Sequence, residues 1–190
     1  YHVLEAVLEA ATGETFAALV QSRIAGPLAL ADTRVADGTV EPRLAASYVV
    51  TGDRGAPGPC LRPERFGASA ALVSTAPDLA RFGAALLGGR LLPAALRDTL
   101  WASGPETGWA AMGQWAYPKR LADGRAVRVV ERQGSLGAHE ALHVLLPDEG
   151  LAVVVLKNAG SASLFGLAWQ PGLPIDLLEA VLAPAAARRR

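Results

Sequence analysis

The chain has 190 residues, of which 51% are hydrophobic and 19% are charged, and its 18 basic and 18 acidic side chains leave no net charge. This balance argues against a nucleic-acid-binding surface, and the length is sufficient to bury a hydrophobic core. The single cysteine, Cys60, excludes an internal disulfide, and no apolar stretch has the length needed to span a bilayer.

Two short helices are expected at the N-terminus. The first, over residues 2–11, has one apolar face, made of Val3, Leu4, Val7 and Leu8. Gly13 then supplies a left-handed stop. The second helix covers about residues 14–25 and ends at Gly26-Pro27.

The middle of the chain predicts a strand, a loop and two helices. The strand lies within residues 45–51, and the Gly- and Pro-rich stretch 52–63 is expected to be a loop. A helix follows with Thr75 as its N-cap and Asp78 as the capping partner, so we interpret Ser74 as part of a cap and not as a nucleophile. That helix is expected to end before Gly88-Gly89, and a shorter helix covers about residues 93–101.

The last third of the chain is rich in predicted strands. They cover residues 109–118, 126–132, 138–146 and 151–158, and a turn at 147–150 joins the last two. A closing helix is expected over about 174–186. Helices, then an antiparallel meander, then a packing helix predict an α+β fold, an antiparallel β-sheet flanked by helices.

One stretch of the predicted hairpin has a second interpretation. Residues 139–143 read His-Glu-Ala-Leu-His, the H-E-x-x-H pattern of zinc peptidases. A helix would bring His139 and His143 onto one zinc ion, with Glu140 activating the bound water. In a strand the two histidines lie about 13 Å apart and cannot share a metal. The apolar run at 151–156 favours the strand, and a zinc metallopeptidase is the alternative function.

Several blocks, in order along the chain, resemble the serine β-lactamase and penicillin-binding-protein family, in its class C-related branch. They are the helix pair ending in Gly26-Pro27-Leu28-Ala29-Leu30-Ala31-Asp32-Thr33, the segment Ala70–Leu79, and the strand pair from Glu131 to the apolar strand that ends in Asn158. The resemblance covers nearly the whole chain. It implies that residues 1–190 are the C-terminal part of one β-lactamase/DD-peptidase-like domain, incomplete at the N-terminus.

This resemblance implies acyl transfer without a cofactor. In the family, the serine of an S-x-x-K motif attacks a carbonyl group, and a Y-x-N motif handles protons. Neither motif occurs in the 190 residues. The resemblance therefore implies a nucleophile upstream, no catalytic residue in this chain, and no activity of the chain alone. Tyr1 corresponds to a packing aromatic that follows the Y-x-N motif.

The third motif of the family falls on Arg132-Gln133-Gly134. Arg132 would hold an anionic or polar substrate group, and Gly134 would let the substrate approach the backbone. The backbone N–H of Ser135 would donate to the developing oxyanion. Gln133 places an amide where lactamases carry a hydroxyl group. In the alternative interpretation, Arg132 is a surface residue paired with Glu131 or Asp148.

The expected substrate is a small ester, amide or peptidoglycan-type peptide. A periplasmic or extracellular location is suggested by the resemblance alone. A non-catalytic relative that binds peptidoglycan or a partner protein is a further alternative. Trp109 and Trp115 are additional candidates for the wall of a substrate cleft.

Overall fold

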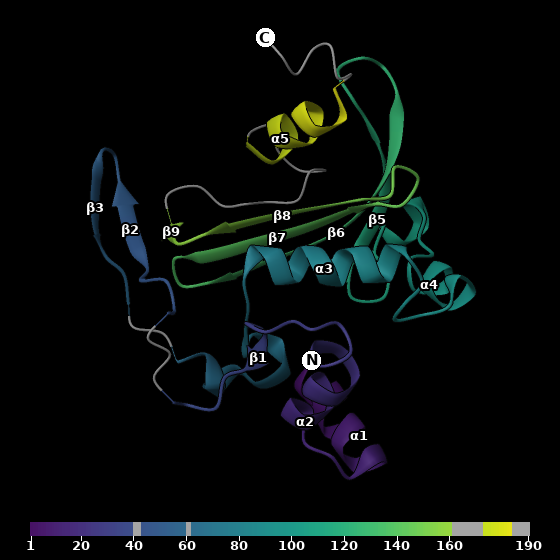
Figure 1. Cartoon of the computed structure of the whole chain (residues 1–190). Coiled ribbons are helices and arrows are strands. Elements are labelled where there is room, and N and C mark those ends of the chain that lie inside the picture. Colours follow the sequence, from purple (N-terminus) through teal and green to yellow (C-terminus); the bar gives the residue numbers. More distant parts are fainter. Residues whose placement is uncertain (40–42, 60–61, 161–172, 184–190) are drawn as a thin grey trace.

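The computed structural model describes residues 1–39, 43–59, 62–160 and 173–183. Cys60, Trp169 and the predicted end of the closing helix lie outside these ranges. The centre of the structure is a four-stranded antiparallel sheet in the order β5-β6-β7-β8, with helices on both of its faces (Figure 1). The predicted α+β class is therefore confirmed.

The sheet consists of β5 (Trp115–Arg120), β6 (Ala126–Leu136), β7 (His139–Leu146) and β8 (Leu151–Lys157). The two hairpins β6–β7 and β7–β8 are those expected from the sequence. The start expected for β5 at Trp109 is wrong, because Trp109 has a positive φ of 66° and lies in a turn that precedes the strand. Conversely, β6 runs four residues beyond its predicted end.

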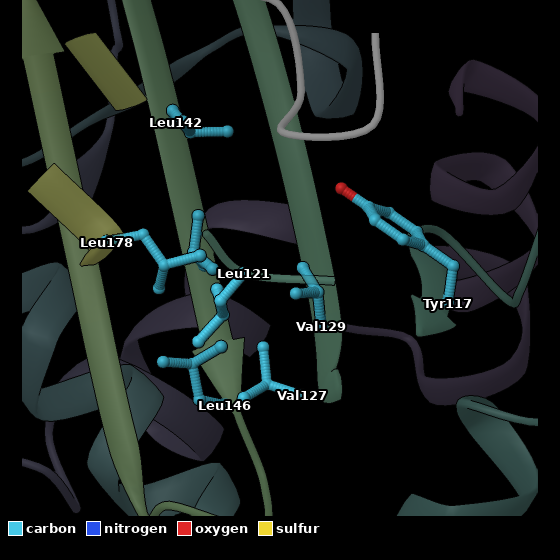
Figure 2. Packing of buried hydrophobic residues seen from close by; sticks show 8 residues of the cluster. Tyr117, Leu121, Val127, Val129, Leu142, Leu146 and Leu178 are labelled. Atoms are coloured by element: carbon cyan, nitrogen blue, oxygen red, sulfur yellow. The ribbon is translucent and has the colours of Figure 1, made fainter. Parts of the chain in front are cut away.

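Each face of the sheet carries its own hydrophobic cluster, as the period of two along a strand requires. One cluster packs under helix α5 (Leu173–Leu182), and Figure 2 shows Leu178 of that helix among the strand residues. Its buried members are Tyr117, Leu121, Val127, Val129, Leu142, Val144, Leu146 and Leu178. The opposite cluster lies under helix α3 (Ala76–Leu87) and contains Leu86, Trp101, Ala116, Val130 and Leu145.

A glycine lets helix α3 lie close to the sheet. A Cβ atom at Gly83 would lie 2.7 Å from Nε2 of His143 and 2.8 Å from Cβ of Ala152, both closer than van der Waals contact. The absence of a side chain at this position therefore fixes how near the helix axis comes to β7 and β8.

The first two predicted helices are present, and the first has its apolar side exposed. Helix α1 (His2–Thr12) ends at Gly13 in the left-handed conformation, and α2 (Phe16–Val20) continues into the π-helical turn η1 (Gln21–Ala25). The apolar face of α1, made of Val3, Leu4, Val7 and Leu8, is exposed to solvent. The reason is that its polar face makes the contacts with the rest of the chain.

The cap of helix α3 links two of the sequence blocks. Thr75 accepts a hydrogen bond from the backbone of Asp78, as predicted for an N-cap. The carboxylate of Asp78 instead contacts the block that ends at Thr33. It accepts hydrogen bonds of 2.9 Å from the Asp32 N–H and from the Thr33 hydroxyl. Burial raises the pKa of the Asp78 carboxyl, but these bonds and Arg81 outweigh it and hold the pKa below its usual value.

A second, smaller sheet stands at one end of the main one. Strand β2 (Tyr48–Thr51) pairs with β3 (Arg54–Pro57) and with β9 (Ala159–Gly160). Strand β3 lies inside the stretch that the sequence predicted as loop.

The remaining short elements are β1 (Arg34–Val35), β4 (Leu72–Val73), η2 (Pro63–Ser69), α4 (Ala94–Leu100) and η3 (Pro105–Thr107). Among the helices in the described ranges, none combines the length and the apolar composition needed to cross a bilayer.

Candidate functional site

The candidate site lies where strand β6 extends beyond the end of its neighbour β5. Pairing between the two strands ends at Trp115 opposite Glu131, whereas pairing between β6 and β7 continues to Leu136 opposite His139. In the part of the chain that the structure describes, no strand pairs with residues 132–136 along their second edge. The four predicted site residues, Arg132, Gln133, Gly134 and Ser135, all lie on this open edge.

The pairing register indicates which backbone groups face the open edge. A two-residue connection joins β6 to β7, and the pair that closes such a turn, Leu136 and His139, exchanges hydrogen bonds. Bonding alternates along an antiparallel ladder, so Gly134 also bonds toward β7. Gln133 and Ser135 therefore direct their N–H and C=O groups away from β7, along the unpaired edge.

The guanidinium group of Arg132 lies against two aromatic rings. Its Cζ atom is 4.9 Å from the ring centroid of Trp115 and 5.8 Å from that of Tyr1. The side chain is exposed, and the ion pairs found in the described residues include none with Glu131 or Asp148. Contact with the π faces orients the side chain and leaves its N–H donors available to an anion.

Glu131 lies on the opposite face of β6 from Arg132. Its side chain is only 1% exposed, and the hydroxyl of Tyr117 donates a hydrogen bond of 2.7 Å to it. The surface pairing between Glu131 and Arg132 that the alternative interpretation required is therefore absent from this structure.

The remaining positions of the open edge differ in their surroundings. The side-chain oxygen of Gln133 is buried and has no hydrogen-bond partner in the described residues. At Gly134 an added Cβ atom would meet nothing within 4 Å, so the packing of this chain does not require a glycine there. The empty space above Gly134 is open to a ligand that approaches the strand.

The segment before β2 closes the end of the sheet beside this edge. The carbonyl oxygen of Ala45 accepts a hydrogen bond from Nε2 of His139, and that of Ala46 accepts one from the Asn158 amide, both at 2.7 Å. Nearby, Glu140 and Lys157 face each other across β7 and β8 and form an ion pair of 2.8 Å. No local sequence pattern predicts these long-range contacts.

The H-E-x-x-H residues lie in strand β7, as the hairpin interpretation expected. His139 bonds to Ala45 at one end, and His143 packs under helix α3 with its ring centroid 6.0 Å from that of Phe82. The two imidazoles therefore do not converge on one point. Within the described ranges, no group of three or more His, Cys, Asp or Glu side chains could hold a metal ion.

His143 is a buried imidazole on the helix α3 side of the sheet. Burial lowers its pKa to about 4, and a hydrogen bond with the backbone of Leu79 opposes this effect only in part. Its Nε2 atom has no hydrogen-bond partner among the described residues and lies beside Gly83. His143 is thus a neutral packing residue under helix α3, on the strand that pairs with the closed edge of β6.

Sequence reasoning did not assign Tyr1 to the site. It predicted a packing aromatic there, and the structure places the ring beside Arg132. Trp115 was named as a possible cleft aromatic, and it now flanks the same guanidinium. The signal for Trp115 was its place on the predicted strand that enters the sheet, whereas Tyr1 is distant in sequence and had none.

A family model described as Beta-lactamase matches residues 1–169 of the chain. No curated protein is significantly similar to it.

Several solved structures share the fold. One is a D-stereospecific amidohydrolase from Streptomyces sp., with 24% identity and a TM-score of 0.73 over 94% of this chain and 52% of that one. Another is a D-amino acid amidase from Ochrobactrum anthropi SV3 complexed with D-phenylalanine, with 19% identity and a TM-score of 0.68 over 84% of this chain and 50% of that one. A third is an octameric penicillin-binding protein homologue from Pyrococcus abyssi, with 20% identity and a TM-score of 0.69 over 86% of this chain and 38% of that one. The chain thus spans about half of the first two proteins and less of the third.

Proposed function

The chain belongs to the beta-lactamase family, and on that premise we propose that residues 1–190 are the C-terminal part of one serine hydrolase domain. The domain cleaves an ester, an amide or a peptidoglycan-type peptide through an acyl-enzyme. The observation that carries the proposal is the unpaired edge at residues 132–136, which adjoins an arginine without a described ion pair.

The open edge suits a carbonyl substrate for a physical reason. The N–H groups of Gln133 and Ser135 point to the unpaired side of β6, where a strand-like substrate can accept hydrogen bonds from them. In the proposed arrangement Ser135 donates its N–H to the carbonyl oxygen as negative charge develops there. Gly134 between them presents no side chain, so the substrate can lie close to the backbone.

Arg132 supplies the positive charge in this proposal. Its planar guanidinium pairs with a carboxylate or another polar group of the substrate through two parallel hydrogen bonds. Tyr1 and Trp115 hold the group in place before the substrate arrives, so that less side-chain freedom is lost on binding.

The nucleophile of this proposal comes from residues upstream of Tyr1, since no Ser-x-x-Lys occurs in the chain. Its oxygen bonds to the substrate carbonyl carbon, and the carbonyl oxygen becomes the oxyanion. Collapse of this intermediate breaks the bond to the amine or alkoxide, which leaves with the serine proton. Water then attacks the acyl-enzyme and releases the acid.

Amides of amino acids are the first substrates to test, because the amidase from Ochrobactrum anthropi is also described in a complex with L-phenylalanine amide. The test is to produce the chain with its upstream sequence and to measure hydrolysis of D-phenylalanine amide and of a chromogenic ester. We expect a covalent acyl adduct, located by mass spectrometry on an upstream serine. Residues 1–190 alone are expected to show no enzymatic turnover, and turnover by that chain would refute the assignment of the nucleophile.

The two alternatives from the sequence predict other results. A zinc peptidase would bind stoichiometric zinc and lose it on the substitution His143→Ala. A non-catalytic relative would bind peptidoglycan fragments or a partner protein and would lack Ser-x-x-Lys in its upstream sequence.

A further inference from the structure

The open edge leads into a hairpin tip that extends past both neighbouring strands of the main sheet. Pairing between β7 and β8 ends at Glu140 opposite Lys157, whereas pairing between β6 and β7 continues to Leu136 opposite His139. In the described ranges the tip therefore contains two strands, whereas the centre of the sheet contains four. A two-stranded hairpin is only marginally stable in water, so the direction of backbone groups near the tip depends on other contacts.

The side chain of His139 makes one of these contacts. Its Nε2 atom lies 2.7 Å from the carbonyl oxygen of Ala45, which is 94 residues earlier in the chain. A carbonyl oxygen only accepts hydrogen bonds, so Nε2 carries the proton and donates it. Because His139 also closes the turn opposite Leu136, this bond ties the hairpin tip to a segment outside the main sheet.

The turn at the tip also packs against strand β9. Ala138 is only 3% exposed, and a Cβ atom added at Gly160 would lie 3.3 Å from both its Cα and its Cβ atom. Strand β9 therefore lies about as close to the turn as a glycine permits. Since β9 pairs with β2, the smaller sheet supports the tip of the larger one at this end of the molecule (Figure 1).

The segment that accepts the hydrogen bond from this imidazole is itself anchored on both sides. The side-chain amide of Asn158 donates a bond of 2.7 Å to the carbonyl oxygen of Ala46, and the Asn158 carbonyl accepts one of 2.8 Å from the backbone N–H of Tyr48. On the other side, the carbonyl oxygen of Ser47 accepts a bond of 2.7 Å from the N–H of Gly58. The segment is therefore a fixed point for the hairpin tip.

From these contacts we infer that His139 is a positioning residue of the candidate site. Its imidazole fixes the hairpin tip at Leu136, and the tip sets the direction of the N–H of the preceding residue, Ser135. The inference rests on the proposed function, in which this N–H donates to the developing oxyanion.

The effect of His139 should fall on the chemical step. A donor to the oxyanion stabilises the transition state only if it points to the place where the charge develops. A displacement of about 1 Å can lower the rate by about 100-fold. Ground-state binding depends on Arg132 at the other end of the open edge. Loss of the imidazole should therefore lower kcat and leave KM unchanged.

The first test measures hydrolysis of D-phenylalanine amide by the chain with its upstream sequence. His139→Leu removes the donor, and we expect kcat to fall by about 10-fold or more while KM changes by about 2-fold or less. His139→Gln supplies an amide donor of similar reach and should restore kcat to within about 3-fold. The control is Arg120→Leu, which removes an exposed bond of 3.0 Å to the carbonyl of Gly124 at the opposite hairpin turn and should leave both constants unchanged.

The second test does not require catalysis. It measures ¹⁵N relaxation dispersion of the backbone amides in residues 1–190. We expect exchange on the microsecond-to-millisecond timescale at Ser135 and Leu136 in His139→Leu, and none at these amides in His139→Gln or Arg120→Leu.

The outcomes separate this inference from the proposed function. Exchange at Ser135 in His139→Leu, without hydrolysis by the wild-type chain, would support the fixation of the tip and refute the hydrolase. Hydrolysis with a kcat that His139→Leu leaves unchanged would retain the hydrolase and overturn the inference. A loss of kcat that His139→Gln does not restore, or that Arg120→Leu reproduces, would assign the effect to general stability and overturn the inference as well.

Discussion

Glu131 and Arg132 are neighbours in β6, yet one belongs to the paired half of the strand and the other to the open half. In the paired half, Ala126–Glu131, every residue pairs with β5 on one edge, and Val130 and Glu131 also pair with β7 on the other. Side chains of this half enter the clusters under both helices. In the open half, Arg132–Leu136, one edge is unpaired and most side chains are exposed or half-buried.

This difference separates stability from recognition within a single strand. Burial and hydrogen bonding in the paired half contribute to the free energy of unfolding. Residues of the open half contribute little to it, so their identities are free to serve binding. Substitutions in the two halves should therefore affect different measurements.

The largest effect on stability is expected beside the paired half. Leu145 of β7 is fully buried opposite Val130, against Leu86 and Trp101. Leu145→Ala leaves a cavity that this packing cannot refill and should lower the free energy of unfolding by about 3–4 kcal/mol, as measured by urea denaturation. The matched control is Leu156→Ala on the neighbouring strand, where the side chain is partly exposed, with an expected loss of about 1 kcal/mol or less. Equal losses in the two variants would contradict the assignment of the core.

A smaller effect is expected at the last residue of the paired half. The substitution Tyr117→Phe removes the hydroxyl that donates to the buried carboxylate of Glu131. Hydrogen bonds to charged groups contribute about 1.5–3 kcal/mol, so we expect a loss of about 2 kcal/mol in the free energy of unfolding. The exposed Tyr48 is the control, since Tyr48→Phe should change stability by about 0.5 kcal/mol or less. If Tyr117→Phe left the free energy of unfolding unchanged, this hydrogen bond would contribute nothing to stability.

The face of the sheet under helix α3 should make stability depend on pH. The pKa of His143 is about 4 in the folded chain, below its ordinary value near 6.5, so the unfolded chain binds more protons between these values. The free energy of unfolding therefore falls as the pH is lowered, by about 2 kcal/mol between pH 7 and pH 5, and the loss is complete below the folded pKa.

Urea titrations at pH 7 and pH 5 check this. The substitution His143→Gln should remove most of the pH dependence, and His139→Gln should retain it, because His139 lies at the end of β7, where it bonds to the carbonyl of Ala45. A pH dependence that persists in His143→Gln would assign the effect to another group.

The smallest effect on stability is expected in the open half. Arg132→Ala should change the free energy of unfolding by about 0.5 kcal/mol or less, because the side chain is exposed. It should nevertheless weaken binding of N-acetyl-D-alanine by about 10-fold or more, as measured by NMR titration. Arg128→Ala, on the same side of the paired half, is the control and should leave that affinity unchanged. If both variants lost affinity equally, charge alone and not the site at the open edge would explain binding.

Local patterns sufficed to predict most elements of the fold. The hairpin of β7 and β8 followed from an apolar run and a four-residue turn, and the cap at Thr75 followed from residue types at fixed spacing. The start of β5 could not be predicted, because it depends on the left-handed conformation of Trp109, which residue type does not favour.

The site was predictable in its position along the chain but not in its surroundings. Residues 132–135 followed from the resemblance of the third motif. The contact of Arg132 with Tyr1 joins residues at opposite ends of the sequence, and no local pattern encodes it. The exposure of the apolar side of α1 could not be predicted for a related reason, since periodicity identifies an apolar side but not what packs against it.

The connection between β6 and β7 makes this end of the sheet intolerant of length variation. It consists of Gly137, with a φ of 61°, and the buried Ala138. One inserted residue would shift β6 against β7 and exchange inward and outward positions along the open half. The four-residue turn at the other end of β7 carries no such constraint. Homologues should therefore differ by insertions at residues 147–150 and keep a fixed spacing between Arg132 and His139.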